Sequence, residues 1–353
     1  MIKRRKTKIV KIGNLKIGGD FPVLIQSMTN TPTSNIEKTV RQIKELERAG
    51  CEIIRVGVPD LKSAKALGKI KKKINIPLVA DIHFSATLAC EAMVQGVDKI
   101  RINPGNFPKA GLKEIVKLAK KRKIPIRIGI NSGSLEKDIL GKKEKVTSEM
   151  MIKSAMRNIK LMENLGFKDL VISLKAPDVL RTMKAYELLS NKIIYPLHLG
   201  ITEAGGEFSG TVKSSIGIGS LLLKGIGDTI RVSLSADPAK EVKVGWEILK
   251  SLDLRQGGIK IVSCPTCART GIKVIKIVKE IESVASHIKK PLKVAIMGCV
   301  VNGLGEGREA DLAMVGTGPS LALFMKNGKI IERGRENDIL QKLKGEIKKI
   351  PNL

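Results

Sequence analysis

The fold of this chain is decided by two successive stretches, PLVADI (77–82) and VDKIRI (97–102). Each is an apolar, β-branched run of the length of a buried strand, and a segment with helical character separates them. The same alternation of strand and helix repeats between residues 22 and 235. The eight expected strands are Val23–Met28, Cys51–Val56, Pro77–Ile82, Val97–Ile102, Ile124–Ile130, Asp169–Leu174, Tyr195–Gly200 and Asp228–Leu234.

Eight strands that alternate with helices predict an α/β fold of the (β/α)8 TIM-type barrel class. An open, doubly wound sheet is the alternative architecture for the same alternation. Ahead of the first strand, Thr7–Gly19 (TKIVKIGNLKIGG) has the pattern of a hairpin. We expect this hairpin to plug the floor of the barrel.

The alternation ends near Leu254–Gly258 (LRQGG), and the length of 353 residues is typical of two domains. We therefore expect a substrate-binding barrel over residues 1–253 and a smaller α+β domain over residues 254–353. In the second domain we expect a glycine-rich loop after the second strand. The other elements expected there are strand Ile259–Ser263, helix Ile272–Ser286, strands Leu292–Met297 and Leu312–Val315, a hairpin around Asn327–Gly328 and a helix from about Asp338.

Lysine and arginine outnumber the acidic residues by 64 to 34, which gives a formal net charge of +30. A balance this positive favours anionic partners such as nucleic acid, an acidic protein or a phosphorylated substrate. Lysines scattered over helix surfaces account for the same total without any partner. Aromatic residues make up only 3% of the chain, too few for an RNA-binding surface that stacks bases.

No segment approaches the roughly 18 apolar residues of a membrane-spanning helix. The basic start, MIKRRKTKIVKIG, has no apolar stretch behind it, so we expect no secretory signal. Five unevenly spaced cysteines without an export signal argue against structural disulfides and predict a cytoplasmic location. We expect Cys51 and Cys90 to be small buried side chains.

Polar and charged side chains gather where the expected strands end, which is where barrel enzymes place their active sites. Side chains two positions apart on a strand share a face, so pairs such as Asp81 and His83 point into the barrel mouth together. The candidate substrate-binding residues are Arg55, Asp81, His83, Arg101, Asn103, Arg127, Asn131, Lys175, His198, Arg231, Ser233 and Ser235.

Five of these candidates are cations: Arg55, Arg101, Arg127, Lys175 and Arg231. An isolated buried cation is costly, so five that converge need an anion among them. Guanidinium groups match phosphate oxygens in geometry. The pattern therefore predicts a small, multiply anionic ligand, most simply a diphosphate. For any single cation the alternative is a salt bridge to a neighbouring loop.

The acidic residues near the barrel mouth have more than one interpretation. Asp81 and His83 have the chemistry of a metal pair, but the surrounding cations favour hydrogen bonding or acid–base chemistry. Glu203 lies in the glycine-rich stretch TEAGGEFSG, which suits a movable proton donor, and we take it as a catalytic candidate. The alternative for Glu203 is a loop carboxylate paired with a lysine.

Three cysteines follow two expected strands of the second domain. Cys264 and Cys267 form CPTC after one strand, and Cys299 lies in MGCVVNG after another. These thiols fit an iron–sulfur cluster, a structural zinc site or, for CPTC alone, a redox-active dithiol. Zinc would need a fourth ligand, and His287 is the only histidine in this domain. In a cluster, an iron without a thiolate would take Glu306 as the nearest suitable oxygen donor.

Several long motifs of this chain are found together in one enzyme family. They are VADIHF (79–84), KIRINPGN (99–106), IGINSGSLEKDI (128–139), LGITEAGGEFSGTVKSSIGIGSLL (199–222), IRVSLSADP (230–238), SCPTCART (263–270) and MGCVVNGLGEGREAD (297–311). On these motifs, which cover essentially the whole chain in order, the sequence resembles the 4-hydroxy-3-methylbut-2-enyl diphosphate synthases. That family belongs to the methylerythritol phosphate route to isoprenoids, and the resemblance is to its compact bacterial type.

The resemblance implies a barrel joined to a [4Fe–4S] domain and an oxidoreductase activity. The implied reaction is reductive ring opening of 2-C-methyl-D-erythritol 2,4-cyclodiphosphate to the linear allylic diphosphate, with two electrons delivered through the cluster. By the same resemblance, Cys264, Cys267 and Cys299 are cluster ligands, and Glu306 is the protein ligand that substrate oxygen displaces. The five cations match diphosphate-binding positions, and Glu203 is the candidate for supplying a proton.

The family also implies partners: flavodoxin or ferredoxin as electron donor, and a homodimer whose site closes between one barrel and the partner's cluster domain. A basic surface would steer such acidic donors. We expect neither a nucleic-acid nor a membrane partner. Two rival classes stay open: a zinc-stabilised nucleic-acid-binding protein, and a barrel enzyme for another phosphorylated or pterin-like substrate with a purely structural cysteine domain.

Overall fold

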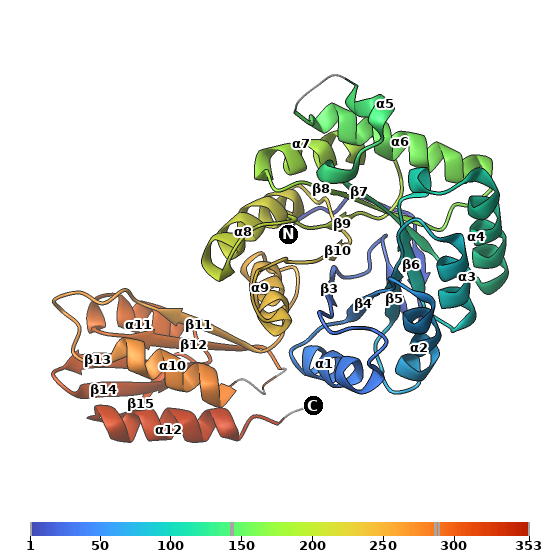
Figure 1. Ribbon diagram of the computed structural model, residues 1–353. Helices are drawn as coiled ribbons and strands as arrows, with labels where there is room; N and C mark the ends of the chain where they lie inside the picture. The colour runs from blue at the N-terminus through green and yellow to red at the C-terminus, as the bar shows by residue number, and fades with distance from the viewer. Residues whose placement is uncertain (1, 142–144, 286–287, 289, 352–353) are drawn as a thin grey trace. The chain divides into compact units, whose positions relative to one another are not determined.

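The computed structural model describes residues 2–141, 145–285, 288 and 290–351. The chain divides into two compact units, Met1–Arg255 and Gln256–Leu353, which are described separately (Figure 1). Among the described residues, no helix is long and apolar enough to cross a membrane. Ser286, expected at the end of a helix, and His287, weighed as a zinc ligand, lie outside the described residues.

The first unit contains a barrel of eight parallel strands. Its strands are β3 (Leu24–Met28), β4 (Ile53–Gly57), β5 (Leu78–Asp81), β6 (Lys99–Ile102), β7 (Ile126–Asn131), β8 (Leu170–Lys175), β9 (His198–Leu199) and β10 (Thr229–Ile230). They are hydrogen-bonded in the order β8-β7-β6-β5-β4-β3-β10-β9. A parallel bridge between Ile172 and Leu197 links β8 to the chain entering β9 and brings the two ends together. The predicted TIM-type barrel is confirmed.

Helices surround the barrel strands (Figure 1). The longer ones are α1 (Ile36–Arg48), α2 (Leu61–Lys71), α3 (Ala86–Val94), α4 (Lys109–Arg122), α6 (Ser148–Asn164), α7 (Val179–Ser190), α8 (Glu207–Leu223) and α9 (Pro238–Ser251). Short turns of helix, η1 (Pro104–Asn106), η2 (Ser132–Ser134) and α5 (Lys137–Leu140), lie in the loops. Outward-facing strand residues such as Ile54 pack with apolar helix residues such as Ile43 and Leu46 of α1.

An N-terminal hairpin closes one end of the barrel interior. Strands β1 (Val10–Ile12) and β2 (Leu15–Ile17) pair antiparallel. Their apolar side chains form one buried cluster with Leu24, Ile53, Val79 and Val171, which come from four barrel strands. The predicted plug of the barrel floor is confirmed. The barrel interior is therefore apolar at the end that the hairpin fills, and charged residues such as Arg55, two positions beyond Ile53, lie toward the other end.

Two of the predicted barrel strands are shorter than expected. The strand predicted over Tyr195–Gly200 pairs only as β9, and Pro196 at its start has no N–H to donate. The strand predicted over Asp228–Leu234 pairs only as β10. Beyond β10 the backbone takes other partners: the Leu234 N–H donates to Glu241 Oε1 at 2.9 Å. Arg231, Ser233 and Ser235 thus follow the strand instead of belonging to it.

The second unit is a five-stranded sheet with helices on both faces. Its strands are β11 (Ile259–Ser263), β12 (Leu292–Met297), β13 (Leu312–Gly318), β14 (Leu321–Lys326) and β15 (Lys329–Arg335), in that order, the first three parallel. Helices α10 (Val274–Ala285) and α12 (Glu336–Lys348) cover one face, where Ile296 and Phe324 belong to the core. The other face, with Ala295 and Val315, packs against Leu304.

The glycine-rich loop predicted after β12 is wrong, because the segment forms helix α11 (Val300–Arg308). Glycine usually disfavours helix interiors. Here Gly303 and Gly307, one turn apart, let the helix lie close against the sheet. A Cβ atom on Gly303 would be 2.3 Å from Val315 Cγ1, and one on Gly307 would be 2.6 Å from Met325 Sδ. Close packing therefore outweighs the low intrinsic propensity.

Candidate active site in the barrel and candidate cluster ligands

A polar pocket of about 140 Å³ opens at the carboxyl ends of the barrel strands. The lining includes all five predicted cations, and it draws on residues from β4 to β8 and from the segments after β9 and β10. It is formed by Arg55, Asp81, His83, Arg101, Arg127, Asn131, Ser173, Lys175, Thr202, Arg231 and Ser233. The parallel strands thus bring together side chains that are up to 178 positions apart in the sequence, from Arg55 to Ser233.

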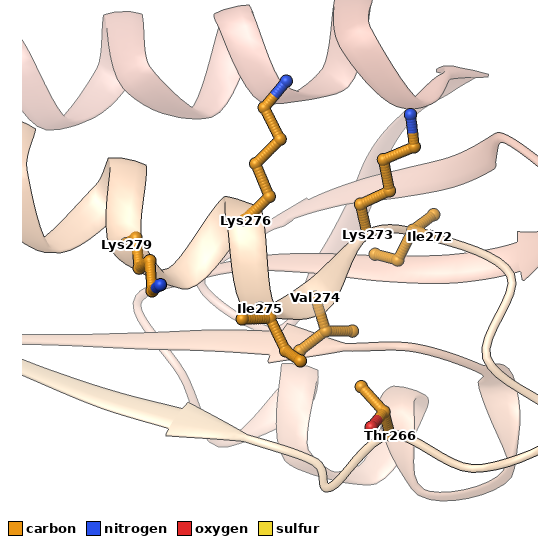
Figure 2. Close-up of a pocket in the computed structure, with 7 residues that line it drawn as sticks. All are labelled: Thr266, Ile272, Lys273, Val274, Ile275, Lys276 and Lys279. Carbon is orange, nitrogen blue, oxygen red and sulfur yellow. The ribbon is translucent and has the colours of Figure 1, made fainter.

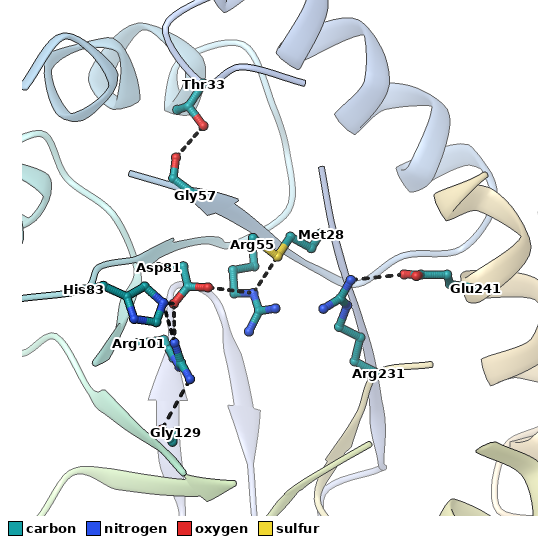
Figure 3. A network of polar contacts seen from close by, with 10 residues as sticks. All are labelled: Met28, Thr33, Arg55, Gly57, Asp81, His83, Arg101, Gly129, Arg231 and Glu241. Carbon is teal, nitrogen blue, oxygen red and sulfur yellow. Dashed lines mark hydrogen bonds and ion pairs between the residues drawn. The ribbon is translucent and has the colours of Figure 1, made fainter. Parts of the chain in front are cut away.

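Asp81 is the centre of a hydrogen-bonded network in the pocket (Figure 3). Its Oδ1 lies 3.1 Å from Arg101 Nη1, and its Oδ2 lies 3.6 Å from Arg55 Nε. Burial alone would raise the pKa of Asp81, but the charges of Arg55 and Arg101 hold it well below its usual range. Asp81 is therefore an ionised carboxylate that orients two arginines.

His83 completes this network as a neutral ring. Its Nε2 lies 2.7 Å from Arg101 Nη1, and a guanidinium can only donate, so Nε2 is the acceptor. Partial burial and the neighbouring Arg101 charge lower the pKa of His83. The second interpretation of Asp81 and His83, a metal pair, gains no third ligand: no set of three His, Cys, Asp or Glu side chains fit to hold one ion occurs among the described residues.

A second buried carboxylate, Glu241 on α9, was missed by the sequence analysis. Its Oε2 lies 3.5 Å from Arg231 Nη2 (Figure 3). Glu241 is 5% exposed. It follows the last predicted strand at a position typical of a helix surface, and the sequence therefore carried no signal for it.

The pocket holds more positive than negative charge. Five cations line it and two carboxylates, Asp81 and Glu241, pair with them, which leaves an excess of three. Burial lowers the pKa of Arg55 to about 9, and burial followed by repulsion from Arg231 lowers the pKa of Lys175 well below its usual value. Arg127 is 1% exposed, and its Nε and Nη1 have no hydrogen-bond partner among the described residues. These cations are arranged for an anion that is not part of the protein.

Beneath the pocket lies a layer of buried polar side chains that do not line it. His198, predicted as a substrate-binding residue, is fully buried there, with Nδ1 2.8 Å from Thr229 Oγ1. Burial lowers the pKa of His198 well below its usual value, and Arg127 and Lys175 lower it further. Lys99, which the sequence analysis did not single out, is also fully buried, and its Nζ has no partner among the described residues.

Three other predicted residues do not line the pocket. Asn103 is 3% exposed, and its amide group has no hydrogen-bond partner among the described residues. Glu203 is exposed, in a left-handed conformation with φ 52°, directly after the pocket residue Thr202. Ser235 is exposed too, and its N–H donates to Gly205 O at 2.9 Å, which ties the loops after β9 and β10 together.

The pocket also contains residues that the sequence analysis passed over. Ser173, which lines the pocket, lies two positions before Lys175. Lys99, in the buried layer beneath the pocket, lies two positions before Arg101. The period of two along a strand, applied one step further back, would have found both. Thr202 carried no such signal, because it follows the end of β9 in a loop.

In the second unit, Cys264 and Cys299 follow the adjacent parallel strands β11 and β12, and Cys299 is the residue that precedes α11. The Gly298 N–H donates to Cys264 Sγ at 3.0 Å. A hydrogen bond from the Arg269 backbone lowers the pKa of the exposed Cys267. A lowered pKa favours the thiolate of Cys267, the form in which cysteine binds iron or zinc.

The other two cysteines differ from these three. Cys51 is 3% exposed, and burial raises the pKa of its thiol to about 12, so it stays protonated and unreactive. Cys90 is half-buried and packs against the barrel core. Glu306 is half-buried on α11, seven positions after Cys299 and thus about two turns further along.

Comparison with known proteins assigns a family domain to each of the two units. Residues 7–246 match the GcpE TIM-barrel domain, and residues 260–349 match the GcpE protein C-terminal domain.

The chain belongs to the GcpE family.

Curated relatives of this GcpE-family protein match over nearly their whole length. The 4-hydroxy-3-methylbut-2-en-1-yl diphosphate synthase (flavodoxin) of Caldanaerobacter subterraneus is 57% identical over 352 residues, covering 99% of both chains. The protein of the same name from Thermodesulfovibrio yellowstonii is 52% identical over 350 residues, covering 99% of this chain and 100% of its own. The family resemblance predicted from the motifs is therefore confirmed.

Solved structures support the barrel fold alone. Dihydropteroate synthase from Stenotrophomonas maltophilia superposes with a TM-score of 0.53 at 14% identity, covering 70% of this chain and 98% of its own. An N-acetylneuraminic acid synthetase from Leptospira borgpetersenii gives a TM-score of 0.51 at 13% identity, covering 80% and 99%. At such low identity the likeness carries no information about substrate.

Proposed function

We propose that this protein catalyses the reductive ring opening of 2-C-methyl-D-erythritol 2,4-cyclodiphosphate to (E)-4-hydroxy-3-methylbut-2-enyl diphosphate, as an oxidoreductase of isoprenoid precursor synthesis. The observation that carries the proposal is the pocket with an excess of three positive charges, in a chain 57% identical to an enzyme named for this product. The pocket's chemistry selects a small, multiply anionic ligand, and the relatives' name supplies which one.

The charge of the reaction fits the pocket. The cyclic substrate has one negative charge on each of its two phosphates. Two electrons break the carbon–oxygen bond to the ring phosphate, a hydroxyl leaves as water, and the freed phosphate oxygen adds a negative charge. Fixed cations such as Arg127 and Lys175 stabilise that developing charge without having to reorganise. The negative charge thus rises from two toward three, and the pocket has an excess of three cations.

The carboxylates in and beside the pocket have two roles in this proposal. Asp81 stays ionised and holds Arg55 and Arg101 in place for the phosphates. Glu241 does the same for Arg231. Glu203 has no ion pair among the residues that the structure describes and follows Thr202 of the pocket wall, so it is the proposed donor of the proton that leaves with the hydroxyl.

Cys264, Cys267 and Cys299 would hold a [4Fe–4S] cluster, with Glu306 as the oxygen ligand to the remaining iron. When bound, the cluster supplies single electrons at low potential. The residues fit this group because Cys264 and Cys299 follow adjacent strands and Cys264 Sγ accepts a hydrogen bond from the Gly298 N–H. A cluster of four irons takes one protein ligand at each iron, so its ligands need not converge on one point as they would around a single ion.

The proposal also includes the wider setting of the enzyme. A flavodoxin-type protein delivers the electrons, as the names of the relatives say of those proteins. The protein acts in the cytoplasm as a homodimer, in which the barrel of one subunit and the cluster domain of the other complete the site. Polar contacts to substrate hydroxyls come from Asn131, Ser233 and Ser235. The buried side chains of His198 and Asn103 do not line the pocket and support the residues that do.

The experiment that tests the function is anaerobic turnover. Protein purified without oxygen is incubated with the cyclodiphosphate and dithionite-reduced methyl viologen, and the product is identified by mass spectrometry. We expect the linear diphosphate, with two electrons consumed per molecule. Protein that contains iron and sulfide but forms no product would overturn the proposal, and so would stoichiometric zinc without sulfide.

A further inference from the structure

A groove with a volume of about 480 Å³ lies beside the cysteine loop of the second unit (Figure 2). It runs along the first turns of α10, and Thr266 closes it on the other side. Lys273, Lys276 and Lys279 line it at intervals of three residues, and the exposed Ile275 lies between them. Figure 2 shows Ile275 on the side of the helix nearer Thr266, with Lys273 and Lys276 extending away from it.

The lysines place positive charge around the groove, because the Lys273 and Lys276 side chains extend away from its apolar centre (Figure 2). Lys276 has one weak ion pair, 3.9 Å from Glu280, and that same carboxylate also pairs with Lys344. Lys273 and Lys279 have no ion pair among the described residues. An apolar centre with a cationic rim is the composition of a protein-docking surface for an acidic partner. Exposed lysines without arginine are less suited to grip a single phosphate.

The groove shares its wall with the proposed cluster ligands. Thr266 stands between Cys264 and Cys267 in the sequence CPTC, so a protein seated against Thr266 lies against the loop that carries two of the three thiols. The loop itself is exposed from Pro265 to Arg269, and Arg269 adds a further positive charge. Electron transfer slows steeply with distance, so the place for a donor protein is next to this loop.

We propose that the groove lined by Lys273, Lys276 and Lys279 is the docking surface for an acidic flavin-carrying electron donor of the flavodoxin type. The inference rests on the proposed function, because a redox partner has a use here only if the cysteines hold an electron-transferring cluster. The lysines attract the acidic surface around the donor's flavin, and Ile275 provides the apolar contact at the centre. A cluster held by the neighbouring cysteines would take one electron from the reduced flavin in each encounter.

The test is charge reversal at the groove in the full-length, cluster-containing protein. The variant combines Lys273→Glu, Lys276→Glu and Lys279→Glu. We expect the KM for reduced flavodoxin to rise at least about tenfold and its salt dependence to flatten. Turnover with reduced methyl viologen, a small donor that needs no docking surface, should stay within about twofold of the wild type. The matched control reverses Lys113, Lys117 and Lys121, three exposed lysines at helical spacing on α4.

An unchanged KM for flavodoxin would overturn the proposal. An equal loss with methyl viologen would also overturn it, because the lysines would then support the cysteine loop and not a partner. Titration calorimetry with oxidised flavodoxin decides the question independently of turnover. Binding that weakens in the groove variant and not in the α4 control supports the surface. If the wild type binds flavodoxin but turns over no cyclodiphosphate with either donor, the proposed function fails while the surface stands.

Discussion

The barrel pocket and the cysteine end of the second unit are built in opposite ways. In the pocket, Arg55, Arg127 and Lys175 are each less than 9% exposed and are fixed by strands within a packed core. In the second unit, Cys267 is exposed, and Cys264 and Cys299 are half-buried. Holding like charges together lowers the stability of the barrel. The cysteines, in contrast, lie at or near the surface, and we expect a bound group to order them.

This difference shows what orients the side chains of each site. The cations of the pocket are oriented by the fold and by Asp81 before any ligand arrives, so the pocket is pre-organised for charge. The thiols have uncharged hydrogen-bond partners: Cys264 Sγ accepts from the Gly298 N–H, and Cys267 from the Arg269 backbone and the Thr270 side chain, within the part of the chain that the structure describes. The barrel site should therefore survive loss of the cluster, and the cysteine site should lose its order with it.

Removal of a cluster ligand should have the largest effect. We expect Cys299→Ala to abolish turnover with methyl viologen and to lower the iron content from about four per chain. The melting transition of the barrel should stay unchanged, because Cys299 belongs to the other unit. Iron analysis measures the iron content, and differential scanning calorimetry measures the melting transition. Cys90→Ala is the control, and activity that survives in Cys299→Ala would point to a purely structural cysteine domain.

Neutralising a buried cation should separate binding from stability. In Arg127→Met, loss of a charge-assisted hydrogen bond to phosphate, worth roughly 1.5–3 kcal/mol, should raise KM about 10- to 150-fold. The same change removes a buried guanidinium whose Nε and Nη1 have no hydrogen-bond partner within the described ranges of the chain, so the free energy of unfolding should rise. Urea unfolding measures the free energy of unfolding, and steady-state kinetics measures KM. The exposed Arg157→Met, which loses only its pair with Asp138, should raise neither quantity. A less stable Arg127→Met protein would contradict this interpretation.

Lys99 offers a finer test, because it is buried beneath the pocket and does not line it. Lys99→Met keeps the side-chain length and removes an Nζ that has no hydrogen-bond partner in the part of the chain that the structure describes. We expect the free energy of unfolding to increase by about 1–3 kcal/mol, with a smaller change in KM than in Arg127→Met. A KM effect equal to that of Arg127→Met would mean that the substrate reaches deeper than the pocket.

The smallest effect concerns pH. His198 is buried and neutral, with its pKa well below 6.5, whereas in the unfolded chain it titrates near 6.5. Below that pH the unfolded state binds more protons, so stability falls as pH falls. His198→Asn removes this contribution, and between pH 6.5 and 5.5 it should lose about 1 kcal/mol less than the wild type. Identical pH profiles of the free energy of unfolding would show that His198 can be protonated in place.

The sequence predicted most of the barrel, and physical reasons explain what it missed. Segments such as 77–82 are short, mostly apolar runs, a pattern typical of buried strands. The hairpin at 7–19 was predictable because its two strands are neighbours in the sequence. The helix at Val300–Arg308 was missed because three glycines lower its propensity, and only the three-dimensional packing of Gly303 against Val315 reveals why they are there.

The residues of the candidate site likewise divide into those that the sequence pattern predicts and those that only tertiary packing places. Cations on strands follow the period of two, so Arg55, Arg101 and Arg127 were found where they line the pocket. His198 was predicted by the same rule, but it lies one layer beneath the pocket. The period of two determines which face of the strand a side chain is on, and not how far along the barrel axis it lies. Glu241 and Thr202 come from a helix and a loop, whose approach to the pocket depends on tertiary packing.

The most direct test of the division between the two regions is a calorimetric titration of the cyclodiphosphate into anaerobic Cys299→Ala protein. We expect binding with an affinity within about tenfold of the wild type, because the cations that hold the phosphates lie entirely in the barrel. Turnover by the same sample should be absent. Loss of binding together with turnover would contradict this result, because it would mean that the cysteine region, and not the barrel, builds the anion site.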